Sequence, residues 1–215
     1  MKLGRLFIAA TIAVTAAIVG TTFTSSDAEA RRVNGERYFD YGAHKWKIWK
    51  GRTTTTGGYV SNKSPIKKRK VRYSTKHKPG TIVVNTKERR LYLVLKGGKA
   101  LKYGIGVGRD GFQWTGTHKV TRKAEWPGWT PPKRMIARVK RETGKTLKGY
   151  YPGGPTNPLG ARSLYIGSTI YRIHGTNQPW SIGKAMSSGC IRLANDDVTD
   201  LYNRVGVGAK VVVQN

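Results

Sequence analysis

Short runs of β-branched or alternating apolar residues follow one another from about Pro79 to the end of the chain. Turns rich in glycine and polar residues separate them. The runs cover residues 81–86, 90–96, 99–108, 116–126, 161–167, 169–176 and 210–214. Strands at this spacing are typical of a sandwich or barrel, so the pattern predicts a mainly β domain over residues 79–215.

One helix is predicted near the C-terminal end. Its apolar residues recur on one face, at Val198, Leu201, Tyr202 and Val205. Asn195 is a favourable N-cap and Gly206 is expected to end the helix. Residues 127–160 are instead rich in Pro, Gly, Trp and Tyr, so we expect long loops there, either irregular surface loops or walls of a binding site.

The first thirty residues have the pattern of a cleavable secretory signal. Lys2 and Arg5 precede an apolar run, residues 6–20, and a polar stretch ends in Ala28-Glu29-Ala30. The run is shorter than the roughly 20 residues of a membrane-spanning helix. We therefore expect export to the periplasm or cell envelope, with an uncleaved anchor as the alternative.

Positive charge is concentrated just after this segment. The chain has a net charge of +29, and residues 31–78 hold 15 Lys and Arg against two acids. Because residues 31–78 have no sustained repeat of apolar residues, we interpret them as a flexible basic arm. Its partners would be anionic envelope polymers or lipids, unless the charge serves only solubility. Export argues against nucleic acid as a partner.

Cys190 is the only cysteine, which is unusual for an exported protein. It is either an inert buried residue or a reactive thiol. His174 ends an alternating strand and could accept the thiol proton, while Arg192 would favour the thiolate. Gly175 offers a backbone carbonyl to orient the imidazole. The amides around Ser188 and Gly189 could form an oxyanion hole.

Two other kinds of site are not supported. Residues 106–111 fit a G-x-G-x-x-G pattern, but a turn and a strand follow where a dinucleotide site needs a helix. The four histidines lack metal-ligand spacing. No metal and no cofactor are expected.

The residues around the cysteine closely resemble the L,D-transpeptidase family, also called the YkuD domain. The resemblance rests on His174-Gly175-Thr176 followed by Ser187-Ser188-Gly189-Cys190-Ile191-Arg192, and on "YGIGVG", "WPGWTPP" and "NPLGARSLYIG" upstream. It covers about residues 79–215. It implies a YkuD-like β-sandwich with one C-terminal-side helix and long loops over the active site.

The resemblance also implies a role in cell wall biogenesis. Cys190 would attack the carbonyl of the third residue of a peptidoglycan stem peptide and release D-Ala. The thioester would pass to a neighbouring stem, an envelope protein or water. His174 would be the base, Gly175 its orienting partner, and Ser188 and Gly189 part of the oxyanion hole. Ser187 and Arg192 would shape the site or bind a substrate carboxylate.

One departure and one alternative remain. Many members of the family have a histidine at the position of Ser188, so here His174 would act as the sole imidazole. A non-catalytic envelope-binding module on the same fold is the alternative, and the presence of both Cys190 and His174 argues against it.

Overall fold

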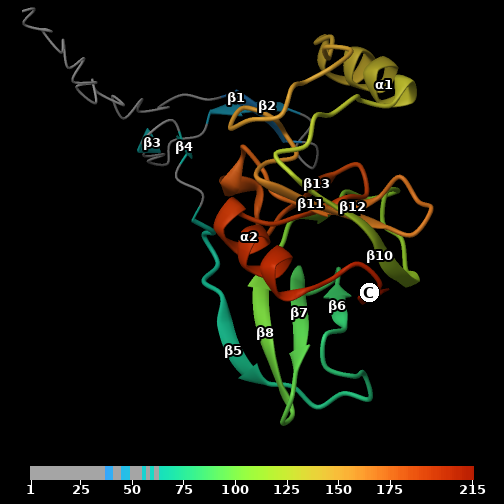
Figure 1. The fold of residues 1–215 in the computed structure, drawn as a ribbon. Helices are drawn as coiled ribbons and strands as arrows, with labels where there is room; N and C mark the ends of the chain where they lie inside the picture. Colours follow the sequence, from blue (N-terminus) through green and yellow to red (C-terminus); the bar gives the residue numbers. More distant parts are fainter. Residues whose placement is uncertain (1–36, 41–44, 49–54, 57–58, 61–62) are drawn as a thin grey trace, which may run out of the picture.

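The computed structural model describes residues 37–40, 45–48, 55–56, 59–60 and 63–215. Nine strands form one curled sheet in the order β14-β12-β11-β10-β15-β6-β7-β8-β5 (Figure 1). These strands are β5 (Arg69–Arg72), β6 (Ile82–Asn85), β7 (Arg90–Leu95), β8 (Lys99–Gly104), β10 (Gly116–Glu125), β11 (Arg162–Ile166), β12 (Arg172–His174), β14 (Ile191–Arg192) and β15 (Lys210–Gln214). The expected mainly β fold is therefore confirmed.

Three strand pairs lie outside this sheet. They are β9 (Val107–Gly108) with β13 (Ala185–Ser187), β1 (Arg37–Asp40) with β2 (Lys45–Ile48), and β3 (Thr55–Thr56) with β4 (Tyr59–Val60). The pair β9 and β13 is parallel. Because β13 ends at Ser187, this pair holds the chain just before the cysteine.

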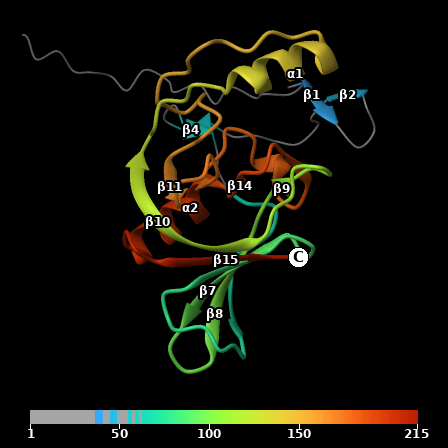
Figure 2. The ribbon, with the colours of Figure 1, turned by 90° about the vertical axis from the view of Figure 1, so that its right-hand side faces the viewer.

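The long strand β10 joins the two halves of the curled sheet. Its first part pairs with β15 and its second part with β11, with a register shift between Val120 and Arg122. Figure 2 shows β10 bending from one half to the other. A bulge of this kind bends a strand, which lets the sheet close over its own apolar face. The enclosed core includes Ile82, Leu91, Tyr103, Leu164, Ile173 and Ile191.

The predicted C-terminal-side helix is present as α2 (Asn195–Arg204). Val198 and Leu201 are fully buried in the core, as their spacing predicted. The prediction that Asn195 is the N-cap is wrong, because Ala194 occupies that position. The Asn195 Oδ1 instead accepts hydrogen bonds from the amides of Ala161 and Thr176, each at 3.0 Å. Its side chain therefore ties two loops together near His174.

A second α-helix, α1 (Lys133–Thr143), lies inside the region expected to form loops. None of its residues is buried, so its apolar residues gave only a weak signal against a strongly basic background. Pro132 precedes it and Gly144, in the left-handed conformation, ends it. A short 3₁₀ helix, Pro179–Ser181, lies between β12 and β13.

The sheet also extends into the segment expected to be a flexible arm. Strand β5 pairs antiparallel with β8 at the edge of the sheet, so the structure differs from the expectation over residues 69–72. Lys68, directly before β5, forms a 2.9 Å ion pair with Asp200 on α2. The proposed signal, residues 1–30, lies outside the described residues. Within the described part of the chain, no helix is long and apolar enough to cross a membrane.

Candidate active site

His174 and Cys190 meet where two parallel strands run side by side. His174 is the last residue of β12, and Cys190 directly precedes β14. Ile173 pairs with Ile191 and His174 pairs with Arg192. Since side chains alternate along a strand, His174 shares its face with Arg172 on its own strand. On the neighbouring strand it shares its face with Arg192 and with Cys190, two residues before it.

Both side chains line one small pocket of about 100 Å³. One wall comes from the segment leading into α1 and from α1 itself. The lining residues are Trp129, Pro132, Met135, Pro158, Leu159, Ile170, Tyr171, Arg172, His174, Ser187, Ser188, Cys190 and Arg192. Of the residues predicted for the site, only Gly175 and Gly189 are not in this lining, and each adjoins a residue that is.

The His174 ring is buried and held by its neighbour's backbone. Its Nδ1 lies 2.6 Å from the Gly175 carbonyl oxygen, which accepts a hydrogen bond when Nδ1 carries the proton. That tautomer leaves Nε2 as a proton acceptor. Burial, with the positive charge of Arg192 adding to it, lowers the pKa of His174 to about 3, although the Gly175 carbonyl acts the other way. The imidazole is therefore neutral near pH 7.

Cys190 is surrounded by opposing influences. Burial raises the pKa of its thiol, while hydrogen bonding to Arg172 and the charges of Arg172 and Arg192 lower it. The net direction is upward, so the resting pair consists of a neutral thiol and a neutral imidazole. A thiolate must then form by proton transfer during the reaction and is not stored beforehand.

Arg172 is the functional candidate that the sequence reasoning missed. It is two residues before His174 on β12, and its hydrogen bonding and charge act on the Cys190 thiol to lower the pKa. Strand alternation was the signal that could have identified it, because residues two apart share a face. Its guanidinium also lies 5.0 Å from the centre of the Tyr165 ring, which limits its freedom.

Ser187 closes the turn that carries the cysteine. Its Oγ donates a hydrogen bond to the Cys190 carbonyl at 2.6 Å and accepts one from the Gly189 amide at 3.2 Å. The side chain is buried. This geometry favours shaping the turn over binding a substrate carboxylate. The amides of Ser188 and Cys190 are the other N–H groups of the turn.

Gly189 is required by both backbone conformation and space. Its φ is +104°, and a Cβ there would overlap the Tyr171 ring. The Gly189 carbonyl accepts a 2.8 Å hydrogen bond from the Trp114 indole, which stacks on Tyr171 with ring centres 4.6 Å apart. The turn is therefore fixed from both sides.

Gly175 also has no room for a side chain. A Cβ at Gly175 would overlap the Asn195 Oδ1 that binds the Ala161 and Thr176 amides. The chain thus passes close to α2 directly after His174, and this contact sets the direction of the Gly175 carbonyl.

Ser188 faces α1. Its Oγ accepts a 2.7 Å hydrogen bond from Arg138 Nη2, and the Arg138 guanidinium lies 4.5 Å from the centre of the Phe112 ring. Arg109 adds a second attachment, with both Glu142 oxygens 3.0 Å from its Nη2. Helix α1 is therefore bound to the catalytic turn and to the loop after β9.

Among the described residues, no group of three or more His, Cys, Asp or Glu side chains could hold a metal ion. What the pocket offers is a thiol, an imidazole that can accept its proton, and two guanidinium groups. Together they suit nucleophilic attack on an acyl group next to a carboxylate.

Comparison with known proteins gives consistent matches to this region. A family model for the L,D-transpeptidase catalytic domain, YkuD, matches residues 79–213. The probable L,D-transpeptidase YbiS of Escherichia coli (strain K12) is 44% identical over 135 residues, which are 60% of this chain and 43% of that protein. The probable L,D-transpeptidase ErfK/SrfK of the same strain is 42% identical over 138 residues, which are 61% and 43%.

A solved structure described as the Ldtfm-avibactam carbamoyl enzyme has a TM-score of 0.50 at 21% identity. It covers 65% of this chain and 50% of that chain, and it supports the fold alone. The match also spans less than half the length of the two curated relatives.

Proposed function

Since the chain belongs to the L,D-transpeptidase catalytic-domain family over residues 79–213, we propose that it is an exported peptidoglycan L,D-transpeptidase. One observation carries the proposal: Cys190, His174 and Arg172 line a single narrow pocket. A thiol beside a neutral imidazole is the minimum needed for acyl transfer through a thioester.

In the first step, His174 Nε2 takes the thiol proton as Cys190 Sγ attacks the carbonyl carbon of the third stem residue. The tetrahedral oxyanion is held by amides of the 188–190 turn. When the intermediate collapses, the C–N bond to D-Ala breaks and His174 returns the proton to the leaving amine. Cys190 remains as a thioester.

In the second step, an amine attacks the thioester and passes a proton to His174, which returns it to the departing sulfur. The acceptor is the side-chain amine of a neighbouring stem, giving a 3→3 cross-link, or an amine of an envelope protein. The pocket near Cys190 contains Arg172 and Arg192, whose guanidinium groups suit the carboxylates of stem peptides.

The proposed location is the periplasm or cell envelope, reached through the signal of residues 1–30. Behind the signal, residues 31–78 would hold the enzyme near anionic envelope polymers or lipids. The net charge of +29 supports this, because a basic protein concentrates near a polyanionic matrix.

The test uses purified residues 31–215 and soluble disaccharide-tetrapeptides, with products read by mass spectrometry. Loss of D-Ala with appearance of a 3→3 dimer supports transpeptidation. Loss of D-Ala with addition of water makes the protein a carboxypeptidase. An unchanged substrate mass, or equal turnover by the Cys190→Ala variant, rejects the proposal.

A further inference from the structure

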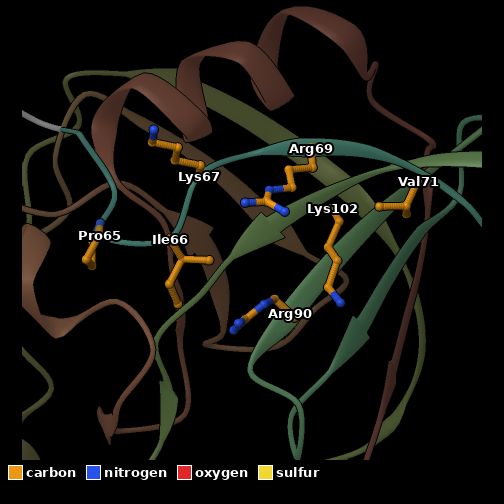
Figure 3. A pocket seen from close by; sticks show the side chains of 7 residues that line it. All are labelled: Pro65, Ile66, Lys67, Arg69, Val71, Arg90 and Lys102. Atoms are coloured by element: carbon orange, nitrogen blue, oxygen red, sulfur yellow. The ribbon is translucent and has the colours of Figure 1, made fainter.

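A second basic site lies on the sheet, formed by β5 together with β7 and β8. It is a groove of about 590 Å³ whose lining includes Lys67, Arg69, Arg90 and Lys102. Figure 3 shows the groove, with Arg69, Arg90 and Lys102 between Pro65 and Ile66 at one end and Val71 at the other. We call it the β5 groove. No carboxylate is among the described residues that line it.

The strand register places these positive charges against one another. Arg69 of β5 is directly opposite Lys102 of β8, and Lys102 is opposite Tyr92 of β7. Like charges in facing positions destabilise a sheet. Neither Arg69 nor Lys102 forms an ion pair with a carboxylate among the described residues. An anionic ligand would supply the missing counter-charge.

Protection of an exposed sheet edge explains only part of this arrangement. Charged side chains do prevent edge strands from pairing with other chains. Lys70 and Arg72, on the alternate positions of β5, already provide such charges. Edge protection would be served equally by an acid opposite Lys102, so it does not account for cations in both positions.

The groove is shaped, and its cationic groups are positioned. Ile66 packs over Gly104, where an added Cβ would lie 2.6 Å from Ile66 Cβ. Arg90 Nη1 is fixed by the Arg89 carbonyl at 2.9 Å. Lys102 Nζ lies 5.4 Å from the centre of the Tyr92 ring. These contacts spread the charges around a hollow and keep them apart.

The groove borders the segment that connects the two catalytic residues. Ile66 lies beside Gly183, where an added Cβ would be 3.0 Å from Ile66 Cδ1. Arg89 donates a 2.9 Å hydrogen bond to the Gly183 carbonyl. Gly183 lies between His174 and Cys190 in the chain. A ligand held in the groove would therefore lie next to the segment that joins His174 to Cys190.

The size of the catalytic pocket argues for such a second site. At about 100 Å³, it is small beside a polymer of linked stem peptides. A polymer that carries many stem peptides must then be held by surface outside the pocket. The β5 groove is several times larger and has a charge opposite to that of stem carboxylates.

We propose that the β5 groove binds carboxylate-bearing stem peptides of the peptidoglycan polymer, away from the stem that reacts at Cys190. This inference rests on the proposed function. It adds a binding site that retains the enzyme on the polymer between reactions, since two linked sites on one polymer raise the effective concentration at each.

The experiment compares two double variants of equal charge in the full chain carrying Cys190→Ala. Arg69→Gln/Lys102→Gln removes the facing pair in the groove. Lys70→Gln/Arg72→Gln removes two charges from the alternate positions of the same strand. Binding is measured by co-sedimentation with insoluble peptidoglycan stripped of phosphate-bearing polymers. Each double variant is also made with Cys190 intact, to measure D-Ala release from soluble disaccharide-tetrapeptides.

The groove double variant, Arg69→Gln/Lys102→Gln, is expected to lower the affinity for peptidoglycan about tenfold. The control double variant, Lys70→Gln/Arg72→Gln, should lower it less than about twofold. Because the groove pair relieves like-charge repulsion, its melting temperature should not fall. Equal weakening by both pairs would show attraction by net charge alone and would overturn the inference, as would no weakening. If the parent chain fails to sediment but binds inorganic polyphosphate, the ligand is a phosphate polymer and the carboxylate assignment is wrong.

D-Ala release from soluble disaccharide-tetrapeptides separates this inference from the proposed function. If the chain with Cys190 intact releases no D-Ala from these tetrapeptides, the proposed function fails whatever the sedimentation result. If D-Ala is released normally and the groove pair sediments like its parent, only the groove assignment fails.

Discussion

Replacing Asp197 by asparagine should stabilise the protein at neutral pH. Asp197 lies in the first turn of α2 and is only 7% exposed. Its Oδ2 is buried and has no hydrogen-bond partner among the described residues. Burial, together with the Asp196 and Asp200 carboxylates and against the opposing charge of Lys68, raises the pKa of Asp197 to about 6.

The expected change in the free energy of unfolding follows from the difference between the pKa of Asp197 in the folded and the unfolded chain. A carboxyl whose pKa is raised on folding binds its proton more tightly in the native state, so stability falls as pH rises from about 4 to 6. The change from 3.8 to about 6 is 2.2 units, which at 1.36 kcal/mol per unit is about 3 kcal/mol. Asparagine also gives up a favourable charge at the helix N-terminus, worth about 0.3–1 kcal/mol. The expected net gain at pH 7.5 is about 2 kcal/mol.

The measurement is urea unfolding of Asp197→Asn and of the parent chain at pH 4 and pH 7.5. The gain should be present at pH 7.5 and fall below about 1 kcal/mol at pH 4, where the parent carboxyl is protonated when folded. Asp196→Asn is the matched comparison, because Asp196 is an exposed acid in the same turn. It removes only one of the charges that raise the pKa of Asp197, so its gain at pH 7.5 should be well below that of Asp197→Asn. An equal gain at both pH values, or a loss at pH 7.5, would refute the reasoning.

Three further predictions concern the catalytic turn. Because burial raises the thiol pKa, alkylation of Cys190 by iodoacetamide should keep accelerating above pH 9.0; a plateau near pH 6 would instead reveal a stored thiolate. Arg172→Met should slow alkylation at pH 8 about three- to tenfold, whereas Arg122→Met, which loses a contact with the same Tyr165 ring, should leave the rate unchanged. Ser188→Ala and Arg138→Met should each speed hydrogen exchange in residues 133–143, and the double variant should exceed neither; additive effects would show that their hydrogen bond does not hold α1.

The strands and the common pocket of His174 and Cys190 were predictable because both depend on local sequence. Alternation of apolar residues marks each strand whatever its partner is. His174 and Cys190 could be placed near each other because His174 ends a predicted strand and Cys190 directly follows a turn. Arg172 could have been added by the same alternation. By contrast, the Asn195 side chain fitted an N-cap, and only the folded chain reveals the amides of Ala161 and Thr176 as its partners.

Strand β5 and helix α1 were missed for a common physical reason. Each is rich in cations, so its own sequence is typical of solvent-exposed chain. Their attachments come from residues distant in sequence. Lys68, before β5, forms an ion pair with Asp200 far along the chain, and Arg138 donates a hydrogen bond to Ser188. Sequence periodicity carries no information about such pairs.

The attachment of α1 gives the Ser188 side chain a role in addition to the one that its backbone amide suggested. Its hydroxyl binds a helix that walls the pocket. The hydrogen bond from Arg138 and the ion pair between Arg109 and Glu142 are only partly buried, so each contributes about 1 kcal/mol. The position of this pocket wall and the geometry of the turn therefore depend on each other, because the residue that binds α1 directly precedes Gly189 and Cys190.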